Sequence, residues 1–193
     1  IDNKDSEIII SGIGYGKTGT TYDGYPKFIE IYALKDADLR DYKMRSNLTN
    51  SNTYNYDWVM NQLNIQMKEG EYLLIYGNHY SYPNDKSFAN TFFGANIDDL
   101  YDHVVYEDYF YQTMQGGDDS YALEKRTNNS WSYVDRVGNG TANVLSYDDG
   151  WLYRKSGTKP TPTYTSEQWT QCKDCLESST NATASTSFPL KTF

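Results

Sequence analysis

The feature that most constrains the fold is a series of short runs rich in β-branched and aromatic residues, with Gly, Asn, Asp and Pro between them. Several runs alternate apolar and polar side chains, which is the period of a half-buried strand. The residues between the runs are those that favour turns. The pattern therefore predicts seven strands, over residues 7–16, 27–34, 41–46, 71–78, 119–126, 131–138 and 150–156.

Strands at hairpin-to-loop spacing indicate an all-β fold, and the arrangement expected is an antiparallel β-sandwich. Helix is expected to be scarce. The best helical candidates are residues 55–63, 96–103 and 166–172, the last with Ser166 as its capping residue. Because 193 residues is close to the usual size of one domain, residues 1–193 are predicted to form a single domain.

The charge of the chain argues against two classes of partner. With 26 Asp and Glu against 17 Lys and Arg, the net charge is −9 and the sequence pI about 4.6. Lys and Arg never cluster beyond a dipeptide, so we expect no nucleic acid partner and no anionic membrane surface. A membrane span is not expected either, because no stretch approaches the ~20 apolar residues that cross a bilayer.

Two cysteines, Cys172 and Cys175, lie three residues apart in the motif Cys-Lys-Asp-Cys. A thioredoxin-like motif of this spacing follows a strand and opens a helix, and a zinc site needs two further ligands. Neither context is visible in the sequence. The pair is therefore predicted to form a local disulfide or to remain as two thiols.

Four N-glycosylation sequons indicate an extracellular glycoprotein. Each lies in a polar, turn-like segment where a glycan would be exposed, and the acceptor residues are Asn47, Asn128, Asn139 and Asn181. Because Asn and Thr are common in this chain, a secreted protein without glycans stays open as the alternative. Residues 1–10 lack the basic start and the cleavage site of a signal peptide, so we expect any signal to have been removed already.

Residues 11–18, with the sequence SGIGYGKT, look like a phosphate-binding loop after a strand. That loop needs a glycine where this chain has Ser11, and the residues that follow, GTTYDGYPKF, do not favour a helix. Without a helix N-terminus there is no dipole to receive a phosphate. The segment is therefore predicted to be a glycine-rich strand end.

Candidate catalytic residues are few. His79 and His103 have no accompanying nucleophile motif or further histidine, so neither is assigned a catalytic or metal-binding role. Acidic doublets occur at Asp98-Asp99, Asp118-Asp119 and Asp148-Asp149. Next to glycine, aspartate is foremost a turn residue, while its oxygen atoms also suit calcium. We predict turns at the doublets, with a calcium site as the alternative, and neither enzyme activity nor a cofactor.

Five segments of the chain form an ordered set: residues 25–44 (YPKFIEIYALKDADLRDYKM), 69–78 (EGEYLLIYGN), 116–126 (GGDDSYALEKR), 133–138 (YVDRVG) and 151–169 (WLYRKSGTKPTPTYTSEQW). In this order they resemble the lamin tail domain family in its secreted bacterial-type form, over about residues 7–178. The resemblance implies an immunoglobulin-like antiparallel β-sandwich. It also implies that Asp118 and Asp119 form a turn leading into a core strand, and that Ala122 and the neighbouring apolar residues enter the core.

The chain departs from that family in several places. Ala33 stands where the family usually has Asn after the EIY strand, and Arg40-Asp41 replaces a turn of small residues. Residues 47–68 and 79–115 are long loop insertions, longer than a minimal sandwich needs, and special features of this chain are expected there. The family implies a fold more strongly than a function, because its domains occur as accessory, adhesive or structural modules.

We expect a non-catalytic extracellular structural or adhesive glycoprotein. The sequons, the family resemblance and the lack of a catalytic motif support this function. Two alternatives stay open. One is a secreted module that binds a glycan or calcium through its tyrosines, tryptophans and acidic loops. The other is an accessory domain of a secreted nuclease or phosphoesterase.

Residues 177–193 form a Ser- and Thr-rich tail with few apolar groups. Phe188, Leu190 and Phe193 would let the tail lie along the chain's own sandwich as one strand face. Alternatively, the tail or residues 1–10 add a strand to a neighbouring copy by head-to-tail donation. We favour the second arrangement, which predicts a homo-oligomer that builds an extracellular filament or surface layer.

Overall fold

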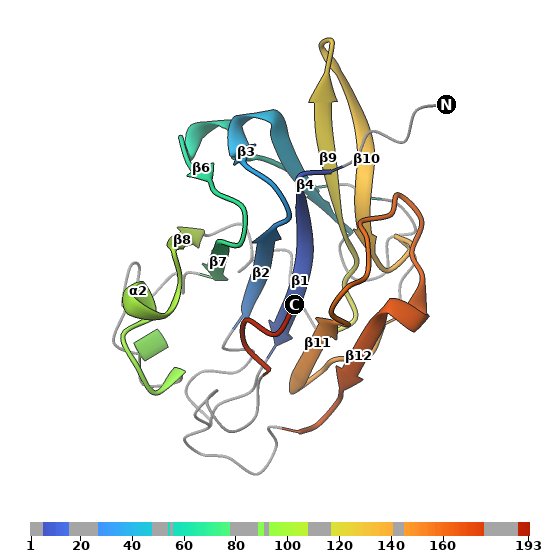
Figure 1. Cartoon of the computed structure of the whole chain (residues 1–193). Helices are drawn as coiled ribbons and strands as arrows, with labels where there is room; N and C mark the ends of the chain where they lie inside the picture. Colours follow the sequence, from blue (N-terminus) through green and yellow to red (C-terminus); the bar gives the residue numbers. More distant parts are fainter. Residues whose placement is uncertain are drawn as a thin grey trace.

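The computed structural model describes residues 6–15, 27–47, 54, 56–77, 89–90, 93–107, 117–140, 145–175 and 189–193. These residues are mostly in strands (Figure 1). The largest sheet has six strands in the order β12-β11-β1-β2-β7-β8, in which β7 and β8 run parallel and the other neighbours antiparallel. Its strands are β1 (Ile8–Tyr15), β2 (Lys27–Ala33), β7 (Tyr72–Gly77), β8 (His103–Glu107), β11 (Gly150–Arg154) and β12 (Trp169–Cys172).

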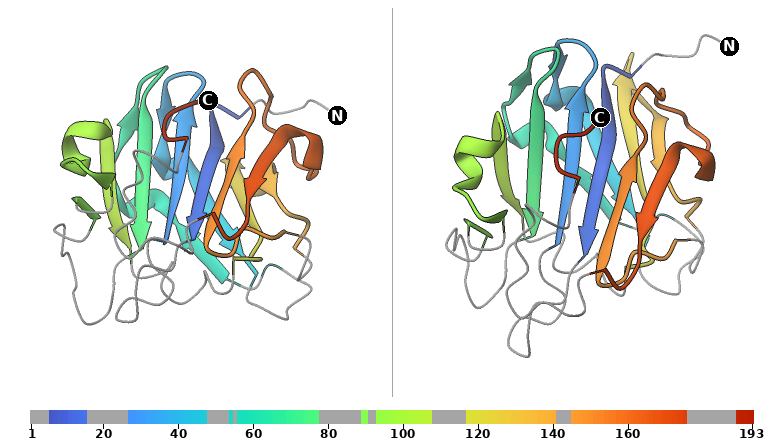
Figure 2. Two further views of the ribbon diagram at one scale, coloured as in Figure 1. Left: turned by 90° about the horizontal axis from the view of Figure 1, so that it is seen from below. Right: turned by 60° about the horizontal axis from the view of Figure 1, so that its bottom comes forward.

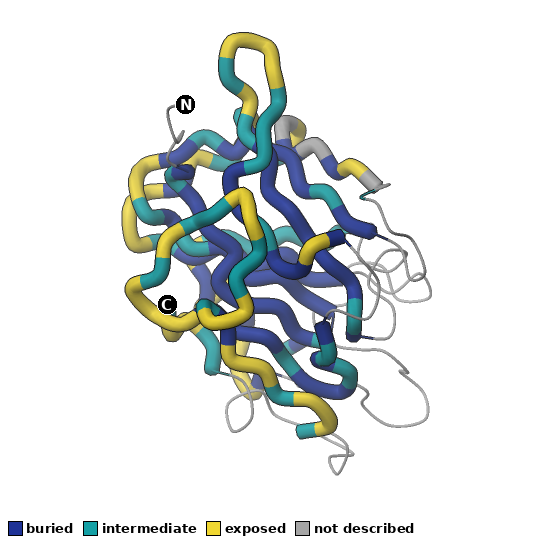
Figure 3. Tube along the Cα trace, turned by 90° about the vertical axis from the view of Figure 1, so that its right-hand side faces the viewer, coloured by how far each residue is buried: buried dark blue, intermediate teal, exposed yellow. Residues whose placement is uncertain are grey.

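The second sheet has four antiparallel strands in the order β10-β9-β4-β5. Its strands are β4 (Tyr42–Ser46), β5 (Tyr56–Val59), β9 (Tyr121–Thr127) and β10 (Ser130–Val137). A small sheet pairs β3 (Ala37–Asp38) with β6 (Gln66–Met67). The hairpin of β9 and β10 projects beyond the rest of the molecule, and its tip is exposed (Figure 3).

The two larger sheets form two layers around a shared hydrophobic core. The six-stranded sheet contributes Ile10, Ile31 and Ile75, and the four-stranded sheet contributes Met44 and Leu123, all fully buried. Burial of this kind contributes roughly 25 cal/mol per Å² of apolar surface, so the contact between the layers is a main source of stability. In Figure 2 the six strands of this sheet lie side by side, in the order β8, β7, β2, β1, β11 and β12.

All seven predicted strands are present near their predicted bounds, as β1, β2, β4, β7, β9, β10 and β11. The prediction of a mostly β chain with antiparallel sheets is therefore confirmed. The sequence pattern missed five further strands, β3, β5, β6, β8 and β12. β3 and β6 have only two residues each, too few for an alternation, and β5 and β12 lie in segments predicted to be helical.

The helix predicted over residues 55–63 is wrong. This stretch contains β5 and then a 3₁₀ turn at Met60–Gln62. In β5, Trp58 pairs with Met44 of β4, and both side chains are buried in the core. Pairing with a neighbouring strand therefore overrides the local helix preference.

Of the other two predicted helices, the first is shorter than expected and the second, over residues 166–172, is wrong. Residues 96–103 form only α2 (Ile97–Leu100) before the chain enters β8. Residues 166–172 form a 3₁₀ turn at Ser166–Gln168 followed by β12. Ser166 is not the cap: Thr165 stands at that position, without a side-chain capping hydrogen bond. No helix among the described residues is long and apolar enough to cross a membrane.

The two insertions supply strands at the edges of both sheets. Residues 47–68 contain β5, the outermost strand of the four-stranded sheet. Residues 79–115 contain β8, the outermost strand of the six-stranded sheet. The described parts of both insertions therefore widen the two sheets.

The segment that looks like a phosphate loop is a strand, as predicted, over its described residues. Gly12 and Gly14 belong to β1, and a Cβ atom on either would overlap the ring of Tyr153 or Phe28, respectively. Both rings lie in a second hydrophobic cluster on the outer face of the six-stranded sheet. The glycines are thus needed so that these rings can lie across β1. Residues 16–18 lie outside the described residues.

Candidate functional site

The outer face of the four-stranded sheet carries rows of charged and aromatic side chains. One row, set by the strand register from β5 to β10, consists of Asp57, Arg45, Ala122 and Arg136. The next row contains Lys43, Glu124 and Tyr133. Because side chains alternate between the two faces of a strand, the residues between these rows enter the core.

A β-bulge in β10 determines which side chain completes the first row. The register with β9 shifts between Tyr133 and Asp135, and such a bulge resets the alternation of faces. Strict alternation would place Asp135 on the same face as Tyr133. With the bulge, Asp135 is fully buried, while Arg136 is half-buried and stacks on Tyr133.

Arg136 is held flat by two tyrosines. Its guanidinium carbon lies 3.8 Å from the centre of the Tyr133 ring and 5.4 Å from the centre of the Tyr54 ring. The two ring centres are 5.8 Å apart. Such cation–π stacking contributes about 0.5–2 kcal/mol and fixes the plane of the guanidinium. The Arg136 Nε atom is buried without a hydrogen-bond acceptor among the described residues.

Arg45 fixes the two tyrosines in place. Its Nη1 atom donates to the Tyr133 hydroxyl at 3.2 Å, and its Nη2 atom donates to the main-chain oxygen of Tyr54 at 3.1 Å. Ala122, which stands between Arg45 and Arg136 in the row, is fully buried, but it lies on the outer face and not in the core cluster between the sheets, where the neighbouring Leu123 lies. We refer to Arg45, Arg136, Tyr54 and Tyr133 as the arginine–tyrosine layer.

The acidic groups beside this layer already have cationic partners. Lys43 lies 2.8 Å from Glu124 and 3.1 Å from Asp57, and Arg45 lies 2.6 Å from Asp57. The Lys43 ammonium group is also 5.0 Å from the centre of the Trp131 ring. Among the described residues, no carboxylate forms an ion pair with the guanidinium of Arg136. Arg136 is half-buried, so the guanidinium can still donate hydrogen bonds to a ligand on this face.

A guanidinium held flat in this way can bind a carboxylate through two parallel hydrogen bonds. The half-buried rings of Trp131 and Tyr133 add aromatic surface on the same face. Comparison with known proteins does not narrow the choice of ligand, because no protein-family model, curated protein or solved structure matches the chain. The chemistry of the face is thus that of carboxylate recognition beside aromatic rings.

The four sequon residues occupy different environments. Asn128 is exposed at the tip of the β9–β10 hairpin, where its φ of 51° suits a two-residue turn, and Asn139 is exposed after β10. The exposure expected for Asn47 is wrong. Its side chain is buried, at 1% relative exposure, because its Oδ1 atom accepts a hydrogen bond from the Ser120 main-chain nitrogen at 2.6 Å. Asn181 lies outside the described residues.

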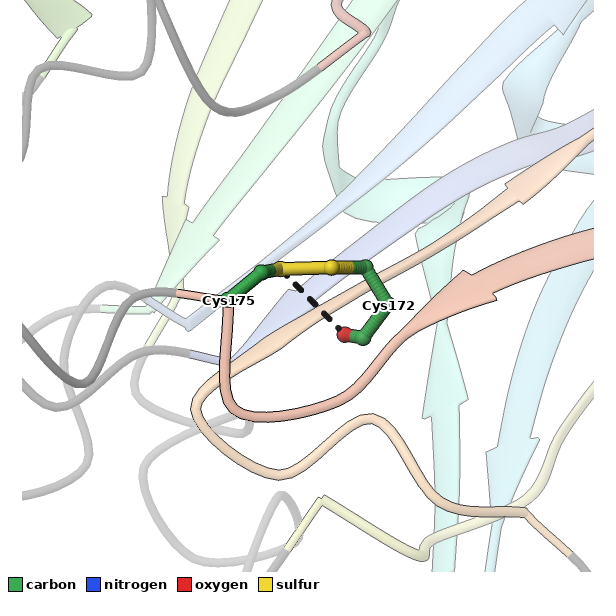
Figure 4. The surroundings of a disulfide bond; sticks show 2 residues. All are labelled: Cys172 and Cys175. Carbon is green, nitrogen blue, oxygen red and sulfur yellow. Dashed lines mark hydrogen bonds between the residues drawn. A yellow bond between two sulfur atoms is a disulfide. The ribbon is translucent and has the colours of Figure 1, made fainter.

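Cys172 and Cys175 form a disulfide, which is one of the two predicted states (Figure 4). Their Cα atoms are 5.9 Å apart, within the usual range for a disulfide. The loop lies against Gly150, where a Cβ atom would overlap the main-chain oxygen of Cys172. The disulfide therefore fastens the end of β12 beside the start of β11.

The disulfide loop also brings Asp174 to the Asp148-Asp149 doublet. The main-chain nitrogen of Asp174 donates to the main-chain oxygen of Asp148 at 2.9 Å. One carboxylate oxygen from each of the three residues lies within 4.8 Å of the others. The doublet forms a turn before β11, as predicted. Carboxylate oxygens are ligands that calcium prefers, but three are fewer than the roughly six to eight it takes, and acidic groups commonly gather in turns, so the cluster by itself assigns no ligand.

The Asp118-Asp119 doublet follows a turn at Gly117, whose φ is 65°. Asp119 is 1% exposed, so its carboxylate belongs to the interior of the protein. It interacts electrostatically with Lys27 at the start of β2. Burial lowers the pKa of Lys27 to about 8, and the negative charge of Asp119 opposes that shift. These contacts give the doublet a structural role.

The remaining candidates from the sequence lie apart from the arginine–tyrosine layer. Asp98 and Asp99 are exposed in the first turn of α2, so the doublet starts a helix, within the segment predicted to be helical, and does not form the turn predicted for it. Their negative charge is favourable at a helix N-terminus. His103 opens β8, and its Nε2 atom lies 2.9 Å from Glu71. His79 lies outside the described residues.

The sequence pattern does not indicate the arginine–tyrosine layer. A partial signal is present, because Trp131 and Tyr133 alternate along a predicted strand. Continued alternation would bring Asp135, not Arg136, to that face. The bulge that exchanges them depends on tertiary contacts, which no local pattern shows.

Proposed function

We propose that the chain is a non-catalytic, extracellular adhesive module, a lamin-tail-like immunoglobulin sandwich that associates with further copies of itself. Its binding surface is the arginine–tyrosine layer, and its ligand is a glycan that carries a carboxylate group. The exposed sequon residues Asn128 and Asn139 and the disulfide support an extracellular location, because glycans and disulfides are features of secreted proteins.

The observation that carries this proposal is the environment of Arg136. Arg136 is half-buried and forms no ion pair with a carboxylate among the described residues, so a ligand that supplies acceptors to its guanidinium would be bound favourably. A carboxylate supplies two of them in the geometry of the guanidinium fork. The rings of Trp131 and Tyr133, on the same face, suit stacking against a sugar ring.

The charge of the whole chain limits which acidic ligands can bind. A net charge of −9 repels a densely charged polyanion such as nucleic acid or a heavily sulfated polysaccharide. A ligand with a single carboxylate is repelled much less by the same net charge, and it gains short-range hydrogen bonds from Arg136. We therefore expect the preferred ligand to be an oligosaccharide with one uronic acid residue.

Calorimetric titration of the full chain tests the proposal. One ligand is an oligosaccharide that ends in a glucuronic acid residue, and the other is the same oligosaccharide with glucose at that end. We expect the acidic sugar to bind at least about 10-fold more tightly, since charge-assisted hydrogen bonds contribute about 1.5–3 kcal/mol. Equal affinity for the two sugars would refute the proposal.

Two matched variants locate the binding surface. Arg136→Gln removes the guanidinium and is expected to abolish the preference for the acidic sugar. Arg40→Gln makes the same change on an arginine that is 51% exposed, pairs with Asp38 and lies outside the layer. It is expected to bind like the wild-type chain. An equal loss of affinity in both variants would indicate a nonspecific charge effect and contradict the proposed site.

A further inference from the structure

The outer face of the six-stranded sheet is covered by a hydrophobic cluster of its own, separate from the core between the layers. The sheet contributes Phe28, Tyr72, Leu74, Tyr76 and Tyr153 to this cluster. Part of its cover comes from the end of the chain, where Leu190 and Phe193 pack against it. Figure 2 shows this segment, residues 189–193, lying over the sheet beside β1 and β2.

Glu30 lies on this outer face, and it is fully buried. Its carboxylate accepts hydrogen bonds from the Ser11 hydroxyl at 2.8 Å and the Tyr101 hydroxyl at 2.9 Å. A third hydrogen bond, of 3.1 Å, comes from the main-chain nitrogen of Lys191. A buried carboxylate needs such donors. One of the three is supplied by the segment that covers it.

Other main-chain and side-chain groups of residues 189–193 also form specific contacts with the surface beneath them. The Tyr72 hydroxyl donates to the main-chain oxygen of Phe193 at 3.0 Å. The Lys191 ammonium group donates to the main-chain oxygen of Leu100 at 2.9 Å and lies 5.2 Å from the centre of the Tyr72 ring. The Phe193 ring packs 5.2 Å from that of Tyr32. The segment is not a strand of the sheet, so it is held in the manner of a bound peptide.

We infer that this surface is a peptide-docking site for the sequence Pro-Leu-Lys-Thr-Phe, and that in concentrated assemblies its occupant is residues 189–193 of a second copy. Every contact described above joins the segment to the surface. The segment of a neighbouring chain would therefore make the same contacts, as in domain swapping. This arrangement differs from the strand addition expected from the sequence, because the segment lies on the face of the sheet and not along its edge.

The length of the connection permits such an exchange. Residues 176–188, between Cys175 and Pro189, can span roughly 45 Å at about 3.4 Å per residue. A short tether gives its own segment an effective concentration on the order of 1 mM. Docking within one chain therefore dominates in dilute solution, and exchange requires copies packed to a similar concentration, as in a surface layer. The inference rests on the proposed self-association and is independent of glycan binding.

Binding of a free peptide to the full chain is the first test. The probe is a fluorescent pentapeptide PLKTF, followed by anisotropy, and the protein is the variant Leu190→Asp/Phe193→Asp, which loses both apolar anchors. We expect saturable binding to this variant and at least tenfold weaker binding to the wild-type chain, whose surface is already occupied. Thr192→Asp adds a charge at an exposed position of the same segment and is expected to behave like wild type. The peptide PLETF is expected to bind at least tenfold more weakly than PLKTF.

Sedimentation of the wild-type chain from about 10 μM to about 1 mM is the second test. We expect an oligomer fraction that rises with concentration and disappears when PLKTF is added in excess. If circular dichroism shows that the double variant does not fold, sedimentation of the wild-type chain with and without PLKTF is by itself the test of the inference. A folded double variant that ignores PLKTF, or a wild-type chain that stays monomeric throughout, would overturn the inference. Oligomers without binding of the acidic sugar would instead overturn only the proposed glycan ligand.

Discussion

Arg154 and Asp135 connect the two sheets through a buried ion pair. The Arg154 Nη2 atom lies 2.8 and 2.9 Å from the two carboxylate oxygens of Asp135, and both side chains are inaccessible to solvent. The pair also binds the main chain of β1: the Ile10 nitrogen donates to Asp135 at 3.0 Å, and the Arg154 Nε atom donates to the Ile10 oxygen at 2.8 Å. These groups need side-chain partners because the ladder between β1 and β11 begins at Gly12.

Breaking this pair is expected to be strongly destabilising. Asp135→Leu or Arg154→Leu should lower the free energy of unfolding by about 3–5 kcal/mol, because each leaves one buried charge unpaired. In the double variant the loss of unfolding free energy should be smaller than the sum of the two single losses, by about 1–3 kcal/mol. That variant should remain less stable than wild type, because the Ile10 groups are left without partners. Urea unfolding of the four proteins measures this coupling, and strictly additive losses would contradict it.

Gly12→Ala is expected to destabilise the chain by about 1–3 kcal/mol, because the added methyl group would overlap the Tyr153 ring that crosses β1. In a Tyr153→Leu background the same substitution should have a much smaller effect. Thermal unfolding of the two single variants and the double variant gives the coupling. A Gly12→Ala effect of equal size in both backgrounds would show that Tyr153 is not the reason for the glycine.

Glu30→Gln is expected to stabilise the chain at neutral pH, by an amount on the order of 1 kcal/mol. Burial raises the pKa of Glu30, while the hydrogen bonds from Lys191, Ser11 and Tyr101 oppose this shift. A carboxyl whose pKa is higher in the folded than in the unfolded state favours folding at low pH, and that contribution is lost as the pH rises through the folded value. The gain from the neutral amide should therefore be larger at pH 7 than at pH 4. A gain that is the same at both pH values would contradict this assignment.

The sequon residues should differ in both stability and modification. Asn47→Ala removes the acceptor of the buried Ser120 N–H group and is expected to cost about 1–3 kcal/mol. Asn128→Ala, at the exposed hairpin tip, should change stability by a few tenths of a kcal/mol. In natively purified protein, the mass lost on deglycosylation should come from Asn128, Asn139 or Asn181 and not from Asn47. Peptide mapping that places a glycan on Asn47 would contradict the structure.

Seven strands could be predicted because the hydrophobic pattern that indicates a strand lies within each short run of residues. In β2 and β7 the apolar side chains recur along short runs bounded by turn residues, and together with the other predicted runs they indicate a mostly β chain. The edge strands β5 and β12 could not be predicted in this way. Trp58 and Trp169 looked like parts of helices, and only pairing with β4 and β11 makes their segments extended.

The candidate site was much less predictable than the fold. The sequence pointed to acidic doublets, cysteines and sequons. Their described residues lie in turns or at the surface, or are buried, as Asn47, Asp119 and Asp149 are. Arg45 and Tyr54 are far from Arg136 in the sequence, and they meet it through the pairing of β4 with β9 and of β9 with β10. The bulge before Asp135 then decides that Arg136 faces outward. Both steps are tertiary, so no local pattern contains them.

The measurement that tests the central claim most directly is an NMR titration of the full chain labelled with ¹⁵N-arginine. The Nε–H signals are followed as the oligosaccharide ending in glucuronic acid is added, and the spectrum of Arg136→Gln assigns the Arg136 signal. The account predicts that the Arg136 signal shifts and saturates, while the signal of buried Arg154 stays in place. An Arg136 signal that does not move at a sugar concentration that saturates binding in the calorimeter would contradict the account.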